Sequence, residues 1–238
     1  MSGHVCVSIY GRDLTDLRNN FTLAQTFGPG FVELRLDYLR SPLQKITQLT
    51  QFSCLPNTIF TFRSRSEGGV ARVSEEIRKQ ILLEIISEIA PTMIDIELKT
   101  LNAFPSLLDS LSRSSSRHTR LVASSHDFQQ MEDLQELEAL IETAKTLYLP
   151  EIIKVVRPAK DFQDNTKILS LYRLAGKIKP SKLVAFCVGQ LGTFSRIACV
   201  SFGSPFTYAA LPNKLTAPGQ LDIQPMKTLL DSWEMKRK

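Results

Sequence analysis

The sequence lacks the features that would place it across a membrane or outside the cell. None of its apolar stretches approaches 18 residues, the length that a membrane-spanning helix requires. The N-terminus lacks the basic region and the long apolar region of a signal peptide, and begins almost at once with a β-rich run. We therefore expect a cytoplasmic protein that does not bind membranes.

Metal-binding and disulfide patterns are also missing. The sequence holds four cysteines, and none of them forms a CxxC motif or another metal-ligand spacing. Cys6, Cys187 and Cys199 lie in or beside apolar runs, which indicates buried free thiols in a reducing compartment. Cys54 lies near an expected turn and is harder to place. The sequence thus predicts neither a metal site nor a disulfide framework.

Little in the sequence favours binding to a nucleic acid or a dinucleotide. The formal net charge is +5, but the basic residues are dispersed and their short clusters lack interleaved aromatic residues. No GxGxxG or P-loop pattern follows a β-rich run. The positive charge suits small anionic substrates equally well, because a cleft focuses the field of the charges that line it.

What is present is a regular alternation of β-rich and helical segments. Helical periodicity is clearest over Ser74–Ile89, Met131–Leu147 and Asp161–Ala175. Eight strands alternating with helices over 238 residues favour a (β/α)8 TIM barrel, in the α/β class, that forms one domain over residues 1–238. A doubly wound open sheet is the alternative. The expected strands are Val5–Tyr10, Phe31–Tyr38, Thr58–Arg63, Met93–Leu98, Leu121–Ser125, Ile152–Val156, Leu183–Val188 and Ala198–Phe202.

One lysine interrupts the β-branched run of the sixth strand. Lys154 lies between Ile153 and Val155 in a run that is typical of a strand buried on both faces. Removing a lysine from water favours its neutral form, and a neutral amine can form a Schiff base with a carbonyl substrate. The alternative is a lysine near the strand end whose ammonium reaches solvent.

Polar residues gather at the ends of the other strands, where the active sites of such barrels lie. Glu33, Arg35 and Asp37 alternate with apolar residues, which puts all three charges on one face of the second strand. A barrel strand has no solvent face, so these charges pair with each other or with a ligand. Further candidates are Asp95 and Glu97 in strand four, Arg63 and Glu67 after strand three, His126 at the end of strand five, Arg196 in the turn before strand eight, and Thr216 and Gln220 in a loop covering the barrel mouth.

Each of these residues has a structural alternative. Glu33 and Arg35 could form an internal ion-pair network, and His126 could lie beside a helix N-cap. Arg63 and Arg196 could neutralise barrel carboxylates. Arginine is also the favoured partner of a substrate carboxylate, because its planar fork forms two parallel hydrogen bonds.

Six motifs together resemble the type I 3-dehydroquinate dehydratases of the shikimate pathway. They are ELRLD, TFRSRSEGG, SSHDF, IIKVV, GTFSRIA followed by FGSPFTY, and TAPGQ, in the family's order and spacing from about Val5 to Ile223. The resemblance implies a (β/α)8 barrel without a cofactor, a homodimer, and dehydration of 3-dehydroquinate to 3-dehydroshikimate by syn elimination through an imine. Another Schiff-base barrel, such as a class I aldolase, or a catalytically inactive scaffold remains an alternative.

The resemblance also implies roles for the candidate residues. Lys154 would form the imine with the C3 ketone, His126 would act as general base and acid, and Glu67 would orient His126. Arg196 would bind the substrate carboxylate with help from Gln220 and Thr216. The ring hydroxyls would be bound by Glu33, Arg35 and Arg63, with Ser8 as a further binding candidate.

The sequence departs from the family at several positions. Phe186 and Val188 stand where some bacterial members have methionines near the imine, and Thr216 replaces the more usual serine. Some members are fused to shikimate dehydrogenase, and the sequence leaves open whether the native polypeptide continues into such a domain.

Overall fold

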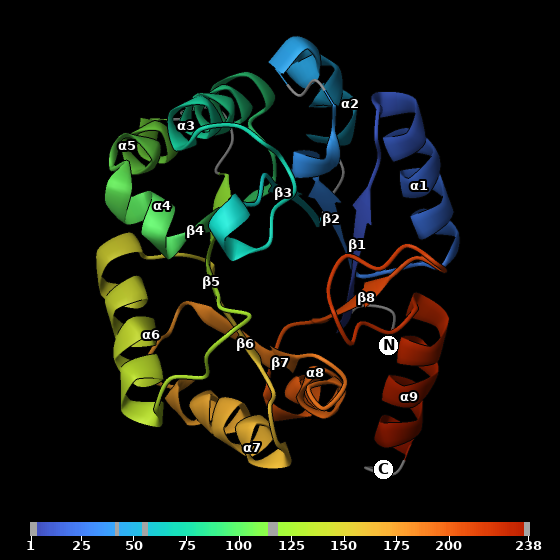
Figure 1. Ribbon diagram of the computed structural model, residues 1–238, viewed down its shortest axis with the longest axis vertical. Helices are drawn as coiled ribbons and strands as arrows, with labels where there is room; N and C mark the ends of the chain where they lie inside the picture. Colours follow the sequence, from blue (N-terminus) through green and yellow to red (C-terminus); the bar gives the residue numbers. More distant parts are fainter. Residues whose placement is uncertain (1–3, 41–42, 54–56, 114–118, 236–238) are drawn as a thin grey trace.

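Eight parallel strands form a nearly closed barrel in the computed structural model, which describes residues 4–40, 43–53, 57–113 and 119–235. The order of the strands is β7-β6-β5-β4-β3-β2-β1-β8, so each strand from β1 to β7 lies beside its neighbours in sequence and β8 pairs with β1. Figure 1 shows the helices arranged around this ring. The strands are β1 Val5–Tyr10, β2 Phe31–Arg35, β3 Thr58–Thr61, β4 Met93–Glu97, β5 Arg120–His126, β6 Ile152–Pro158, β7 Lys182–Val188 and β8 Thr207–Ala210.

Several helices begin where an acidic or hydroxyl side chain caps the first turn. Asp13, Ser74, Asp133 and Asp161 each accept a hydrogen bond from the backbone N–H three residues later, which satisfies a donor that the helix leaves free. The helices are α1 Leu14–Thr26, α2 Thr50–Ser53, α3 Glu75–Glu84, α4 Leu98–Ala103, α5 Ser106–Arg113, α6 Leu134–Tyr148, α7 Phe162–Ser170, α8 Thr193–Ala198 and α9 Ile223–Met235.

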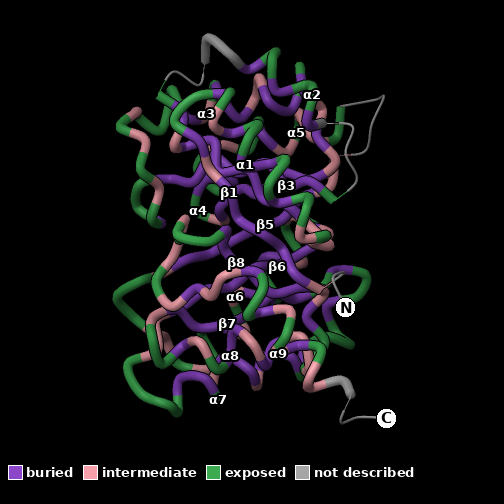
Figure 2. The backbone as a smooth tube through the Cα atoms, turned by 90° about the vertical axis from the view of Figure 1, so that its right-hand side faces the viewer, coloured by how far each residue is buried: buried purple, intermediate pink, exposed green. Residues whose placement is uncertain are grey.

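The hydrophobic core forms two clusters that meet along the barrel. One cluster comes mainly from the first half of the chain and is joined by Leu211, Ile223, Met226 and Leu230 from the C-terminal end. The other comes mainly from residues 122–208. Figure 2 shows that the buried parts of the backbone run through the strands, while loops and the outer faces of helices are exposed. Within the described ranges, no helix combines the length and the apolar character needed to cross a bilayer.

The expected (β/α)8 barrel and the first seven strands are confirmed, with shifts at their ends. Strand β2 stops at Arg35, because residues Leu36–Tyr38 turn into a 3-10 helix. Helix α3 continues into a π-helical turn at Ile85–Ile89, so the helical expectation over Ser74–Ile89 is confirmed. Three cysteines are buried free thiols as expected, and Cys54 lies outside the described residues.

The expected eighth strand at Ala198–Phe202 is wrong. These residues finish helix α8 and form the 3-10 turn Cys199–Phe202, which ends at Gly203 with a φ of 108°. A short apolar run fits a buried helix as well as a buried strand, and periodicity alone does not separate the two. The true strand β8 is Thr207–Ala210, so the crossover after β7 is longer than expected and Arg196 lies on helix α8 and not in a turn before the strand.

Candidate active site

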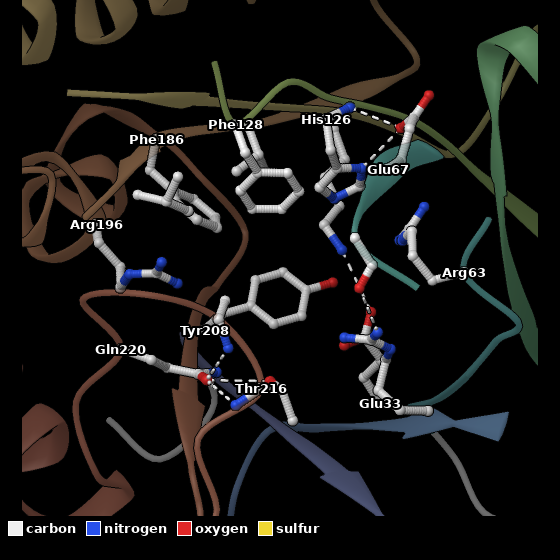
Figure 3. Close-up of a pocket in the computed structure, with 16 residues that line it drawn as sticks. Glu33, Arg63, Glu67, His126, Phe128, Phe186, Arg196, Tyr208, Thr216 and Gln220 are labelled. Atoms are coloured by element: carbon white, nitrogen blue, oxygen red, sulfur yellow. Dashed lines mark hydrogen bonds and ion pairs between the residues drawn. The ribbon is translucent and has the colours of Figure 1, made fainter. Parts of the chain in front are cut away.

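A cavity at the carboxyl ends of the strands brings together nine of the ten residues to which the family resemblance assigns a role. These nine are Glu33, Arg35, Arg63, Glu67, His126, Lys154, Arg196, Thr216 and Gln220. The tenth, Ser8, is not among the lining residues; it lies behind Glu33 and donates a hydrogen bond of 2.6 Å to its carboxylate. Figure 3 shows the lining side chains converging from opposite walls.

Lys154 lies inside this cavity and not at a solvent-exposed strand end. Its side chain is 5% exposed, so the alternative of an ammonium reaching solvent is wrong. The Nζ atom lies 3.1 Å from Asp95 Oδ2 and 3.3 Å from Glu33 Oε1, and it stands over the ring of Tyr208 at 4.2 Å from the centroid. The lysine is therefore held by two carboxylates and one aromatic face.

The two carboxylates beside Lys154 are themselves held ionised by cations. Burial opposes the ionisation of both, but Lys154 and neighbouring arginines outweigh it and hold the pKa of Glu33 below its usual range. For Asp95, Arg63 and Lys154 hold the pKa well below its usual range against the same effect of burial. Both carboxylates are therefore ionised, and their negative charges are balanced by Lys154 and the arginines around them.

Arg63 and Arg35 are already paired with acids from the barrel. The two terminal nitrogens of Arg63 lie 2.8 Å from Asp95 and 2.9 Å from Glu97, and Arg35 forms two hydrogen bonds with Asp37 at 2.8 and 2.9 Å. For Arg63, the alternative of an arginine that neutralises barrel carboxylates is confirmed. Both side chains still line the cavity, so they present their positive charge to it from fixed positions.

His126 is fixed by a single carboxylate oxygen. Glu67 Oε2 accepts the backbone N–H of His126 at 2.8 Å and lies 3.1 Å from its Nδ1. Burial, and then the charges of Arg63 and Lys154, lower the pKa of His126 well below its ordinary value, so the imidazole is neutral at neutral pH. The residue is not an N-cap neighbour, because helix α6 begins only at Leu134 with Asp133 as its cap.

The carboxyl group of Glu67 titrates near neutral pH. Burial raises its pKa to about 7, despite the opposing charge of Arg63. The residue lies in a 3-10 turn that ends at Gly68, whose φ is 89°. A Cβ on Gly68 would stand 2.8 Å from the ring of Phe128, so this glycine allows the turn to pack closely under the segment that follows His126.

Arg196 is a buried cation without a carboxylate partner among the described residues. Its side chain donates one hydrogen bond of 3.3 Å to the carbonyl of Pro218, its Nε has no partner within the described chain, and the guanidinium stacks over Phe186 at 4.5 Å. Burial lowers its pKa to about 10, which still leaves it charged at neutral pH. The alternative that Arg196 neutralises a barrel carboxylate is wrong, and its charge remains available for an anion.

The loop after β8 carries the last two candidates. Gln220 Oε1 accepts hydrogen bonds from the backbone and hydroxyl of Thr216, at 2.9 and 3.0 Å, and from Ala217 N at 3.2 Å. This closed turn places both side chains at the wall of the cavity, with Gln220 nearer to Arg196 and Thr216 below Tyr208 in the view of Figure 3. The loop is anchored where Gly189 N donates to Pro218 O at 3.2 Å, which joins the β8 loop to the end of β7.

Two further residues lie beside Lys154, and the sequence predicts a role for neither of them. Asp95 is a candidate of strand four without an assigned role, and Tyr208 lies on β8, a strand that the sequence predicts too early in the chain. Phe186 and Val188 line the cavity, where the sequence placed them. No group of three or more His, Cys, Asp or Glu in the described ranges is arranged to hold a metal ion.

Comparisons with known proteins agree with this geometry. The family model described as type I 3-dehydroquinase matches residues 5–237. A 3-dehydroquinate dehydratase of Methanococcus maripaludis (strain C5) is 32% identical over 95% of this chain and 98% of its own. The bifunctional 3-dehydroquinate dehydratase/shikimate dehydrogenase of Arabidopsis thaliana is 27% identical over 98% of this chain, which covers 37% of that protein.

Solved structures show the same similarity. The 3-dehydroquinate dehydratase of Geobacillus kaustophilus HTA426 superposes with a TM-score of 0.85 and 25% identity, over 99% of this chain and 92% of that one. The match of the family model spans almost the whole chain and includes each of the cavity residues described above. The chain therefore belongs to the type I 3-dehydroquinase family, whose members are hydro-lyases.

Proposed function

We propose that this hydro-lyase removes water from 3-dehydroquinate through an imine between Lys154 and the C3 ketone, and releases 3-dehydroshikimate. The observation that carries the proposal is one cavity that holds a buried lysine, a neutral histidine fixed by a carboxylate, and an arginine with a free charge. These are the three functions that the reaction requires, namely a nucleophile, a base and an anion site.

The imine makes the elimination possible because it withdraws electrons. A protonated imine at C3 stabilises the enamine formed when C2 loses its proton, which a neutral ketone does less well. Lys154 is the amine in the cavity that suits this step, since its contacts with Glu33 and Asp95 fix the position of Nζ.

His126 is placed to act on the carbon beside the imine. Ser124 of β5 pairs in register with Lys154 of β6, and His126 lies two residues farther along β5, on the same face and one layer nearer the mouth. A neutral imidazole at that height takes the C2 proton and then returns it to the leaving hydroxyl. A single group that serves both steps from one face gives syn elimination.

The remaining residues bind the substrate. Arg196 binds the carboxylate with its free hydrogen-bonding capacity, and Gln220 and Thr216 border the same subsite. Glu33, Arg35 and Arg63 bind the ring hydroxyls from the opposite wall, and Ser8 supports them by holding Glu33.

The decisive experiment is mass spectrometry of the protein after incubation with 3-dehydroquinate and sodium borohydride. Borohydride reduces an imine to a stable amine, so we expect an adduct on the peptide that contains Lys154, together with enone absorbance in unreduced samples. Lys154→Ala should abolish both. Lys182→Ala is the matched control, because that lysine lies on the adjacent strand with its side chain 57% exposed. An adduct that persists in Lys154→Ala, or turnover without any adduct, would contradict the imine route.

We also propose that the chain functions as a homodimer in the cytoplasm and needs no cofactor. Sedimentation equilibrium of the purified protein tests the oligomeric state, and a mass equal to that of one chain would contradict the dimer. Turnover after exhaustive dialysis against a chelator tests the independence from metal ions.

A further inference from the structure

The hydroxyl group of a buried tyrosine in the cavity has no role in the mechanism above. Tyr208 lies on strand β8 beside Cys6 of β1, and only 4% of its surface is exposed. Figure 3 shows its ring crossing the cavity between Arg196 and Arg63, with the hydroxyl directed toward Glu33. Its side chain therefore ends in the half of the cavity where Lys154 is held.

The phenol oxygen has no hydrogen-bond partner among the described residues. A close polar neighbour is the thiol of Cys6, which is a weak acceptor. Glu33 already accepts hydrogen bonds from Ser8, Thr61 and Lys154. An unsatisfied buried hydroxyl costs free energy, and such a group calls for an explanation in a ligand or a reaction.

The phenol of Tyr208 carries its proton at neutral pH and can act as a hydrogen-bond donor. Burial, together with the negative charge of Glu33, raises the pKa of Tyr208 well above its ordinary value. The hydroxyl thus keeps its proton and can offer a hydrogen bond to an oxygen that arrives with the substrate.

The position of Lys154 identifies that oxygen. Its Nζ lies 4.2 Å from the centroid of the Tyr208 ring. When Nζ attacks a carbonyl carbon, the carbonyl oxygen stays one bond away from that carbon and takes up negative charge. It is therefore delivered to the neighbourhood of the phenol while it needs a donor.

We propose that Tyr208 is a further catalytic residue, which donates a hydrogen bond to the oxygen of the carbonyl that Lys154 attacks. The proposal rests on the imine route given above. The neutral amine forms the C–N bond as the carbonyl π electrons move to oxygen, and a proton passes from nitrogen to oxygen. The oxygen then takes a second proton from solvent and leaves as water while the nitrogen lone pair forms the C=N bond of the protonated imine. Tyr208 keeps its proton throughout and stabilises the charge that develops on the oxygen.

The substitution Tyr208→Phe removes only the hydroxyl and keeps the ring under Lys154. In a rapid-quench experiment with borohydride, we expect imine formation to slow at least tenfold, as is found when a donor to a developing oxyanion is lost. The elimination that follows, measured as enone formation from the preformed imine, should keep its rate. If the Tyr208 hydroxyl had only a structural role, its loss would affect imine formation and elimination alike, because both steps take place in the same cavity.

Thermal unfolding of the free protein provides an independent readout. Because Tyr208→Phe removes an unsatisfied buried hydroxyl, we expect its melting temperature to be equal to or higher than that of the parent protein. Tyr172→Phe is the matched control: the Tyr172 hydroxyl is also buried but is hydrogen-bonded to both backbone groups of Ala185, away from the cavity. That variant should melt at a lower temperature and form the imine at the parent rate.

The outcomes separate this inference from the proposed function. If the parent protein forms the adduct and Tyr208→Phe forms it equally fast, the catalytic role of the hydroxyl is wrong while the imine route stands. If the parent protein forms no adduct, both are wrong. Slower imine formation in Tyr208→Phe, with an intact elimination step and an unchanged Tyr172→Phe control, is the result that we expect.

Discussion

The arginines of the cavity differ in how their charges are balanced. Arg63 contacts two carboxylates and Arg35 one, whereas Arg196 contacts a backbone carbonyl and an aromatic ring. A buried charge without a counter-charge destabilises the free protein, because its hydration is lost and not replaced. We therefore expect Arg196 to lower the stability of the free protein, and its unpaired charge to favour the binding of an anion.

Replacement of Arg196 should therefore stabilise the free protein while it weakens substrate binding. We expect Arg196→Met to raise the free energy of unfolding by about 1–3 kcal/mol, as for the removal of other poorly compensated buried charges. We expect the KM to rise about 10–100-fold, since a hydrogen bond to a charged group contributes about 1.5–3 kcal/mol. Urea unfolding and steady-state kinetics measure the two effects.

Arg78 provides the matched control for this prediction. It is buried to a similar extent but pairs with Glu97 at 2.9 Å and donates to the carbonyl of Phe62. Arg78→Met should destabilise the protein by about 3–5 kcal/mol, because the buried carboxylate of Glu97 loses one of its two arginine partners. A loss of stability in Arg196→Met as large as in Arg78→Met would show that Arg196 is a structural residue.

The pair of Glu67 and His126 should control the dependence of the rate on pH. When Glu67 is ionised, its carboxylate accepts a hydrogen bond from Nδ1–H of His126. The Nε2 atom of the imidazole then carries no proton and is free to act as the base. When Glu67 is protonated, it donates to Nδ1, the remaining imidazole proton lies on Nε2, and that base is lost. Since the pKa of Glu67 is raised to about 7, we expect kcat/KM to fall about tenfold per unit as the pH drops below 7.

Glu67→Gln tests this assignment because it retains the shape but not the ionisation. The variant should lose about 10²-fold in rate and show no limb near pH 7, while Glu132→Gln, a change in an acid that pairs with Arg157 outside the cavity, should leave the profile intact. If kcat/KM of Glu67→Gln still fell as the pH dropped below 7, the titrating group would be a residue other than Glu67.

Many residues of the site could be predicted from the sequence one by one. Their chemical type and their position at the end of a predicted strand are enough to identify them. Lys154 was identified as a charge in a β-branched run and His126 as a polar residue at a strand end. Asp95 was not assigned a role, since its contact with Lys154 joins residues 59 positions apart and depends on the curvature of the barrel. A local pattern does not contain such pairings.

Seven of the eight strands could be predicted because a buried parallel strand is a compact run of apolar and β-branched residues. The eighth failed for a physical reason. Ala198 and Cys199 are buried, but Phe202 is 53% exposed, which suits a helical turn that ends at Gly203. The true strand at Thr207–Ala210 has only four residues, two of them alanine, so it carries a weaker β signal than the segment before it.

The loop after β8 depends on close contact with the end of β7. Gly219 has a φ of 68°, and a Cβ at this position would stand 2.1 Å from the carbonyl oxygen of Gly189. Gly219→Ala must therefore shift the loop that carries Thr216 and Gln220. We expect the KM for substrate to rise at least tenfold, because the displacement of a binding group by about 1 Å can cost 10²-fold.

Gly28→Ala separates this clash from simple backbone strain. Gly28 has a φ of 57°, and a Cβ there would have no atom within 4 Å. We expect it to lower the stability by about 1 kcal/mol and to leave the kinetic constants unchanged. Equal kinetic effects of the two substitutions would contradict a specific role for the contact between Gly189 and Gly219.

At the scale of the whole molecule, the C-terminal helix ties the two hydrophobic clusters together. Met226 and Leu230 of α9 pack in the cluster built mainly from the first half of the chain, and Trp233 packs against the other. Strand β8, just before this helix, pairs with β1 and so joins the last strand of the chain to the first (Figure 1). Each half of the core therefore contributes to the same closing element.

This arrangement predicts that the chain unfolds as one cooperative unit, which is also what the proposal of a single domain over residues 1–238 requires. The single tryptophan, Trp233, reports on the closing helix, and far-ultraviolet circular dichroism reports on all helices and strands. We expect the two signals to follow one urea transition with the same midpoint, as in a two-state process. If the fluorescence changed at a lower urea concentration, α9 would detach before the barrel, and the last element would be an accessory and not the link between the two halves of the core.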